Sequence, residues 1–276
     1  YHYDKNHENS YHKFFDNFLH LKNNLIKRKK EKYLINGFKT LRPLNLLWLA
    51  RWPKMFSEFN NFKFLLENVL EEIDNEFVMF VPDDQIFYKK TIIPEKALDL
   101  ISENKHSMYY RFFTGNHFLG KYSLPPKLNV ETFEDNGIKF FKWSNKDRNA
   151  INLWNYRFTI EGTIFHKEGL LNLLKPMIYH NPITLEAIGL WESRFRNLFV
   201  NGLSAEKRTA ATFNINNVQQ LVRTPNSFHS PEKLMEYYNL GYRLQYNEKD
   251  FDDTQLDIVP KGISLKHVST GKIINI

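Results

Sequence analysis

Two adjacent carboxylates, Asp83 and Asp84, follow an apolar run and carry the clearest chemical signal in the sequence. Residues 77–81 are continuously apolar, which is typical of a strand buried on both faces, and Pro82 ends the run. Oxygen-rich acidic turns suit Mg²⁺ or Mn²⁺, which bridge substrate phosphates and keep part of their water. Asp also favours ordinary turns for conformational reasons. The residues alone therefore leave a metal–phosphate site and a plain turn both open.

Helices and strands are predicted to alternate around this pair. Apolar residues recur at helical spacing or in short continuous runs. The predicted helices are 10–30, 58–73 and one from Pro94, and the predicted strands are 77–81, 108–113 and 138–143. This alternation indicates an α/β fold with a mostly parallel central sheet. Ligands of such sheets bind beyond the carboxyl ends of the strands, where we expect Asp83 and Asp84.

The second half of the sequence predicts a strand over 158–165, with Gly162 inside it, and further helices. These helices are expected at 168–174, at 185–198 with Thr184 as its cap, and at 231–240. We find no internal repeat and no linker. We therefore expect a single domain over 1–240, with a small C-terminal tail or hairpin over 241–276.

Composition excludes several classes of protein. The 276 residues contain no cysteine, which excludes disulfide scaffolds, thiol nucleophiles and zinc–thiolate sites. No segment approaches the roughly 18 to 20 apolar residues of a membrane span. The net charge of +7 favours anionic partners without choosing among them. The chain opens at Tyr1 without Met, so we expect a fragment or a processed product.

Residues 64–101, FLLENVLEEIDNEFVMFVPDDQIFYKKTIIPEKALDLI, resemble the nucleotide-sugar half of the GT-A glycosyltransferases. In that family an acidic motif coordinates a divalent cation on the donor diphosphate and touches the ribose. The resemblance implies a GT-A-like fold, with Asp83 and Asp84 as ligands of Mn²⁺ or Mg²⁺ and as nucleotide contacts. A common form of the motif has three Asp residues, and here Gln85 stands third. We therefore expect weaker metal binding, with positive charge from Lys89, Lys90 or Arg111 as the alternative.

Two later segments resemble the acceptor side of the same family. They are NYRFTIEGTIFHKEGLLNLL, over 155–174, and NPITLEAIGLWESRFR, over 181–196. In inverting members a carboxylate at the head of the later helix is the general base, which implies Glu186 in that role. Glu161, beside Gly162, is the second candidate. A base must lie within hydrogen-bond reach of the acceptor hydroxyl, and the sequence leaves the choice between them open.

The stretch NINNVQQLVRTPNSFHSPEKLMEYYNLGYRL resembles the C-terminal part of bacterial surface-polysaccharide glycosyltransferases, which implies a binding role for Gln219. Gln85 is a predicted contact of the nucleotide-sugar donor, and Arg111 and Asn116 are predicted contacts of the donor diphosphate or sugar. Some GT-A enzymes add a downstream His to the metal, for which His229 and His267 are the candidates.

These features predict a nucleotide-sugar-dependent glycosyltransferase with an inverting mechanism. By resemblance, its acceptor is a saccharide or a lipid-linked saccharide in lipopolysaccharide or capsule synthesis. The expected location is the cytoplasm, with peripheral contact at the inner membrane face. Two alternatives stay open: a metal-dependent phosphoryl or nucleotidyl transferase using Asp83 and Asp84, and a non-catalytic sugar-nucleotide-binding module. No basic–aromatic motif supports nucleic-acid binding.

Overall fold

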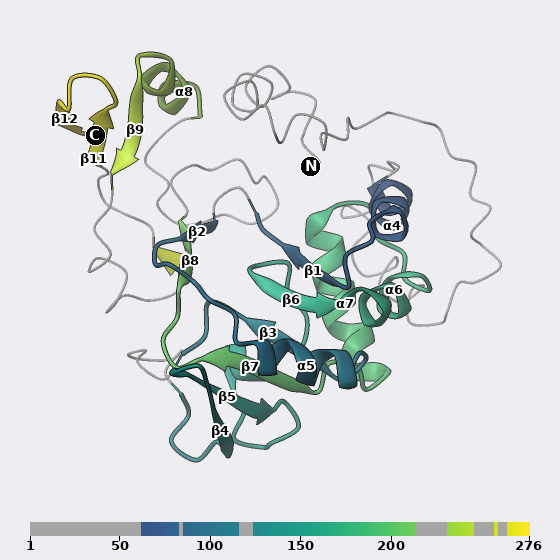
Figure 1. The fold of residues 1–276 in the computed structure, drawn as a ribbon. Helices are drawn as coiled ribbons and strands as arrows, with labels where there is room; N and C mark the ends of the chain where they lie inside the picture. Colours follow the sequence, from purple (N-terminus) through teal and green to yellow (C-terminus); the bar gives the residue numbers. More distant parts are fainter. Residues whose placement is uncertain (1–61, 83–84, 116–123, 214–230, 246–256, 259–263) are drawn as a thin grey trace. The chain divides into compact units, whose positions relative to one another are not determined.

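The computed structural model describes residues 62–82, 85–115, 124–213, 231–245, 257–258 and 264–276 (Figure 1). Contacts divide the chain into two compact units, one of residues 1–77 and 167–198 and the other of residues 78–166 and 199–276. The predicted helix 10–30 lies outside the described residues, as do Asp83, Asp84, Asn116, Gln219 and His229.

The first unit contains the helices α4 (Phe62–Glu72), α6 (Lys167–Leu174) and α7 (Pro182–Phe195). Lys63 of α4 donates to the backbone carbonyls of Leu174 and Lys175 at 3.1 and 3.2 Å. These carbonyls lie at the end of α6, where the helix dipole favours a cation. Lys63 therefore fixes the start of α4 against the end of α6.

Helix α7 begins three residues before the predicted start. Asn181 is its N-cap, and Thr184 N donates to Asn181 Oδ1 at 2.8 Å while Asn181 N donates to Thr184 Oγ1 at 3.1 Å. This reciprocal capping box, with Pro182 at the first helical position, sets the helix start. The prediction of Thr184 as the cap is wrong, because Thr184 is the third residue of the helix. Glu186 is then the fifth helical residue and lies beyond the first turn.

The second unit is built on a six-stranded sheet with strand order β1-β6-β3-β7-β5-β4. The strands are β1 (Phe77–Phe80), β3 (Met108–Arg111), β4 (Val130–Asp135), β5 (Ile138–Ser144), β6 (Thr163–His166) and β7 (Asn201–Ala205). Helix α5 (Glu95–Glu103) begins after Pro94 as predicted and contacts β3 and β6. The short 3-10 helix η5 (Asn152–Asn155) precedes β6.

The sheet is mixed, so the prediction of a mostly parallel sheet is wrong, although the α/β class is confirmed. Strands β3 and β7 are parallel, whereas the pairs β3–β6, β5–β7 and β4–β5 are antiparallel. Strands β4 and β5 form a hairpin whose two-residue loop, Asn136-Gly137, has φ values of 50° and 76°. Asn-Gly is the preferred sequence for such a loop, and it fixes the antiparallel pairing of these two strands.

Two smaller sheets complete the described part of the second unit. Strands β2 (Gln85–Phe87), β8 (Ala210–Phe213) and β10 (Asp257–Ile258) form one, in the order β10-β8-β2. Strands β9 (Tyr242–Gln245), β11 (Ser264–His267) and β12 (Ile273–Asn275) form the other, in the order β12-β11-β9, and α8 (Pro231–Asn239) contacts β9 (Figure 1). The predicted tail thus contains a three-stranded antiparallel sheet. Its Leu265 shares a core cluster with Tyr88 and Ala211. The boundary at residue 240 stays a prediction.

In the six-stranded sheet, the Trp143 indole fills the space beside Gly202. Gly202 of β7 lies opposite Trp143 of β5, and a Cβ built on Gly202 would lie 2.6 Å from Trp143 Cε2. The indole is fixed from its other side, because Trp143 Nε1 donates to Trp154 O at 2.9 Å and the two indole rings meet edge to face. A methyl group at position 202 therefore has no space.

We expect Gly202→Ala to lower the free energy of unfolding by about 2 kcal/mol, because overpacking a filled core typically costs 1–3 kcal/mol. Denaturant unfolding followed by tryptophan fluorescence measures this loss. In a Trp143→Phe background, where a smaller ring leaves room, the added cost of Gly202→Ala should shrink. If Gly202→Ala costs the same free energy of unfolding in both backgrounds, the indole does not exclude the methyl group.

Candidate functional site

Between β1 and β2, two described residues on either side of the acidic pair are hydrogen-bonded to each other. Pro82 O accepts a hydrogen bond from Gln85 N at 3.2 Å, and the chain between them is Asp83-Asp84. Gln85 then begins β2, where it pairs with Thr212 of β8 in antiparallel register. The third position of the predicted motif is therefore held on a strand.

The side chain of Gln85 packs against Gly162. A Cβ built on Gly162 would overlap Gln85 Nε2 and would lie 3.1 Å from Cδ. Gly162 has φ +40°, a conformation that favours glycine. Its N–H donates to Phe80 O at 3.1 Å, and its C=O accepts from Phe112 N at 3.0 Å. Gly162 is thus bonded on both sides, and Gln85 occupies the space that a larger residue would fill.

The carboxamide of Gln85 is buried, with 8% of the residue exposed. Among the described residues, neither Nε2 nor Oε1 has a hydrogen-bond partner. An unsatisfied buried polar group costs about 1–3 kcal/mol, so two on one side chain are a feature that needs an explanation.

Glu161 directly precedes Gly162, and its backbone is fixed. Glu161 N donates to Thr159 Oγ1 at 3.2 Å, and Thr163 Oγ1 donates to Glu161 O at 2.9 Å. The residue is half-buried. The structure therefore places the side chain of Gln85 against Gly162, the residue that follows Glu161.

Arg111 is fully buried below this region of the sheet. Its Nη1 donates to Leu153 O at 2.8 Å and its Nη2 donates to Tyr156 O, so it anchors the η5 segment. The guanidinium carbon also lies 4.7 Å from the Tyr109 ring centroid and 5.1 Å from that of Phe113. Its predicted contact with the donor stays a prediction, and the contacts seen here are structural.

Arg208 was not predicted. It is fully buried, its Nε donates to Tyr88 Oη at 3.0 Å, and that hydroxyl donates to Arg208 O at 3.2 Å. Tyr88 directly follows β2, and Tyr88 N donates to Thr209 O at 3.1 Å. A buried guanidinium thus lies next to the residue that follows β2, the strand that Gln85 begins. Nothing in the local sequence, AEKRTAA, distinguishes this Arg from a surface residue.

Glu186 lies on α7 in the first unit and is half-buried. The same helix carries Glu192, which is fully buried, and His180 precedes its N-cap. His180 N donates to Thr184 Oγ1 at 2.9 Å. Neither residue was predicted from the sequence, because a Glu within a helix and a His just before it look like ordinary surface positions.

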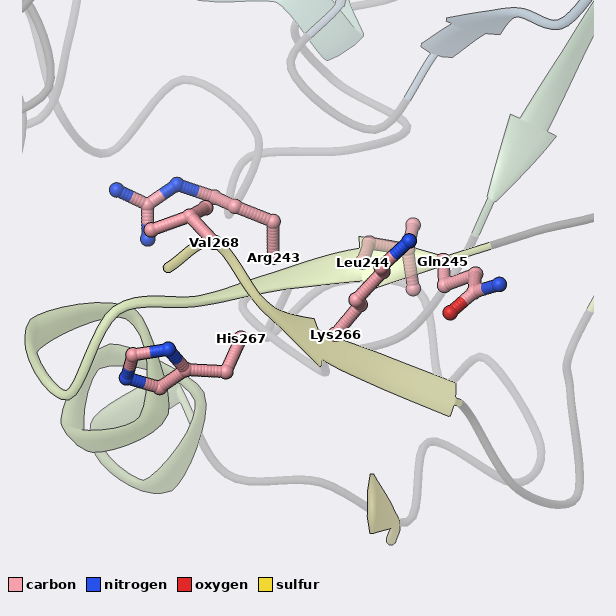
Figure 2. Close-up of a pocket in the computed structure, with 6 residues that line it drawn as sticks. All are labelled: Arg243, Leu244, Gln245, Lys266, His267 and Val268. Carbon is pink, nitrogen blue, oxygen red and sulfur yellow. The ribbon is translucent and has the colours of Figure 1, made fainter. Parts of the chain in front are cut away.

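A hollow of about 400 Å³ lies on the C-terminal sheet, lined by Arg243, Leu244, Gln245, Lys266, His267 and Val268 (Figure 2). Figure 2 shows Arg243 and His267 projecting away from Gln245, so the polar groups do not converge on one point. Arg243 Nη1 donates to Tyr238 O and Tyr242 O, and His267 Nδ1 accepts from Thr270 N at 3.2 Å. The metal role of His267 stays a prediction.

Within the ranges that the structure covers, no three His, Asp or Glu side chains gather closely enough to hold a metal ion. Across the same ranges, every helix is too short or too polar to cross a membrane.

Comparison with known proteins gives one distant relative to report. The chain is 24% identical over 139 residues to the bifunctional glycosyltransferase pgtA of Dictyostelium discoideum, covering 48% of this chain and 18% of that protein. No protein-family model matches the sequence, and no solved structure matches it at a significant level. Over about half its length, the chain is thus similar to a small part of a glycosyltransferase.

Burial lowers the pKa of His180 to about 4, because the apolar surroundings disfavour the imidazolium. The unfolded chain, with an ordinary His pKa of about 6.5, therefore binds a proton before the folded chain does as pH falls. The stability that neutral His180 provides is complete above pH 6.5 and is lost as the pH falls toward 4.

We expect wild-type protein to lose about 3 kcal/mol more than His180→Gln in free energy of unfolding between pH 7 and pH 4. Urea unfolding at both pH values measures the difference. The carboxylates are the same in both proteins, so their contribution to the pH dependence cancels in the comparison. Equal losses in the two proteins would show that His180 is protonated in the fold.

Proposed function

We propose that the chain is a nucleotide-sugar-dependent glycosyltransferase of GT-A-like fold. It transfers a sugar to a saccharide or lipid-linked acceptor in surface-glycan synthesis at the inner membrane face. The observation that carries the proposal is the similarity to part of a glycosyltransferase. The chain's own geometry supports it, because Gln85, at the end of the acidic turn, contacts Gly162, which follows Glu161.

In the proposed reaction, a carboxylate takes the proton of an acceptor hydroxyl. The hydroxyl oxygen then bonds to the anomeric carbon from the face opposite the donor diphosphate, and the bond from that carbon to the diphosphate breaks. One displacement inverts the configuration. Glu161 and Glu186 are the candidate bases. The fixed backbone of Glu161 supports it as a positioned base, and the resemblance supports Glu186.

Asp83 and Asp84 are the residues that would hold Mg²⁺ or Mn²⁺. A donor set of two adjacent carboxylates, in the sequence between the hydrogen-bonded residues Pro82 and Gln85, fits a hard cation that keeps several waters. Such an ion supplies charge that offsets the charge of the leaving diphosphate. Gln85 adds no charge, so we expect weaker metal binding than with three carboxylates. Arg111, Asn116 and Gln219 remain proposed donor contacts.

The donor site is tested by melting the protein with a panel of sugar nucleotides, each with Mn²⁺, Mg²⁺ or a chelator. A donor at 100 times its dissociation constant should add about 2.7 kcal/mol of stability. We expect one donor to raise the melting temperature of the wild type but not of Asp84→Asn. The control is Asp99→Asn, which removes an exposed carboxylate on α5 and should melt like the wild type with the donor. A shift retained in Asp84→Asn would remove the acidic turn from the site.

The base is tested by transfer from that donor to a set of saccharide acceptors. One of Glu161→Gln and Glu186→Gln should lower kcat by about 10²- to 10⁴-fold with the donor-induced melting shift unchanged, and the other should stay within a few-fold of wild type. Full activity in both variants would exclude both carboxylates. Release of phosphate from simple esters without any sugar donor would favour a phosphoryl transferase instead.

A further inference from the structure

Gln85 is a described residue with two buried polar atoms that the fold leaves without partners. It is 8% exposed, both its amide atoms lack hydrogen-bond partners among the described residues, and its side chain touches Gly162. An apolar side chain of the same length, such as Met, would fill this space without leaving polar atoms unsatisfied. The amide is therefore unfavourable for the free protein, and a bound ligand would remove the penalty.

We infer that the carboxamide of Gln85 binds hydroxyl groups of the sugar that is transferred, and so helps to select the donor. The inference rests on the proposed function and names the part of the donor that this residue contacts.

The two unsatisfied atoms decide the kind of group that binds. Nε2 can only donate hydrogen bonds, and Oε1 can only accept them. A phosphate would satisfy Nε2 alone, and a metal ion would satisfy Oε1 alone, so each would leave the other atom buried without a partner. A hydroxyl both donates and accepts, and neighbouring hydroxyls of a sugar ring present both functions along one edge. An uncharged ligand also suits a neutral side chain in a buried position.

The position of Gln85 favours the transferred sugar over the ribose, which carries the same chemistry. In the proposed reaction the sugar ring lies between the leaving diphosphate and the base. Gln85 directly follows the acidic turn and contacts Gly162, next to the candidate base Glu161. Gln85 adjoins the acidic pair in sequence and contacts the neighbour of Glu161, so we expect the sugar ring beside it.

The test compares wild type with Gln85→Met and with the control Gln245→Met, which changes an exposed Gln on β9. Calorimetry measures the dissociation constant of each sugar nucleotide in a panel, and of the matching nucleoside diphosphates, which lack the sugar but keep the ribose. We expect Gln85→Met to weaken the bound sugar nucleotide at least tenfold, with nucleoside diphosphate binding changed less than twofold. Gln245→Met should change neither constant.

The melting temperature without ligand separates a binding amide from a structural one. Gln85→Met should melt at or above the wild-type temperature, because it removes two unsatisfied polar atoms and keeps the contact with Gly162. Equal weakening of sugar nucleotide and nucleoside diphosphate, or a lower melting temperature with unchanged affinity for both, would overturn the inference and leave the proposed function standing. If wild type binds no member of the panel, the proposed function fails, and the inference fails with it.

Discussion

The close approach of Gln85 to Gly162 is the constraint on which the candidate site depends. Gly162 has a positive φ, and its backbone is hydrogen-bonded to Phe80 on one side and to Phe112 on the other. Only glycine leaves space for the Gln85 side chain there. Because Gly162 has no side chain, Gln85, which follows Asp83-Asp84, packs against the segment that carries Glu161.

Local patterns predicted most helices and strands of the described residues. Local signals predicted the start of α5 and both ends of α6 and α8 within one residue, because helix ends carry such signals. The direction of the strands was not predictable in this way, since a short apolar run looks the same in parallel and antiparallel sheets. The Asn136-Gly137 loop was the local signal for a hairpin. Thr184 was predicted as the cap of α7, and the structure uses it at the third helical position in a capping box with Asn181.

The candidate site could be predicted only in part. Gln85 and Gly162 are 77 positions apart in the sequence, and their contact depends on strand order, which no local pattern contains. Arg111 was chosen because it follows apolar residues, and the structure explains that pattern by burial against Tyr109 and Phe113. Arg208 became visible only through the fold, because its burial depends on Tyr88, which is 120 positions away.

Hydrogen–deuterium exchange with and without sugar nucleotides tests most directly where a donor binds. A bound donor should slow exchange in the peptides covering 78–88 and 159–166 together, because the Gln85–Gly162 contact joins them. Peptides covering 242–245 and 264–268, which line the hollow on the C-terminal sheet, should exchange as in the free protein. Protection confined to those C-terminal peptides would contradict the account and would place the donor on the other sheet.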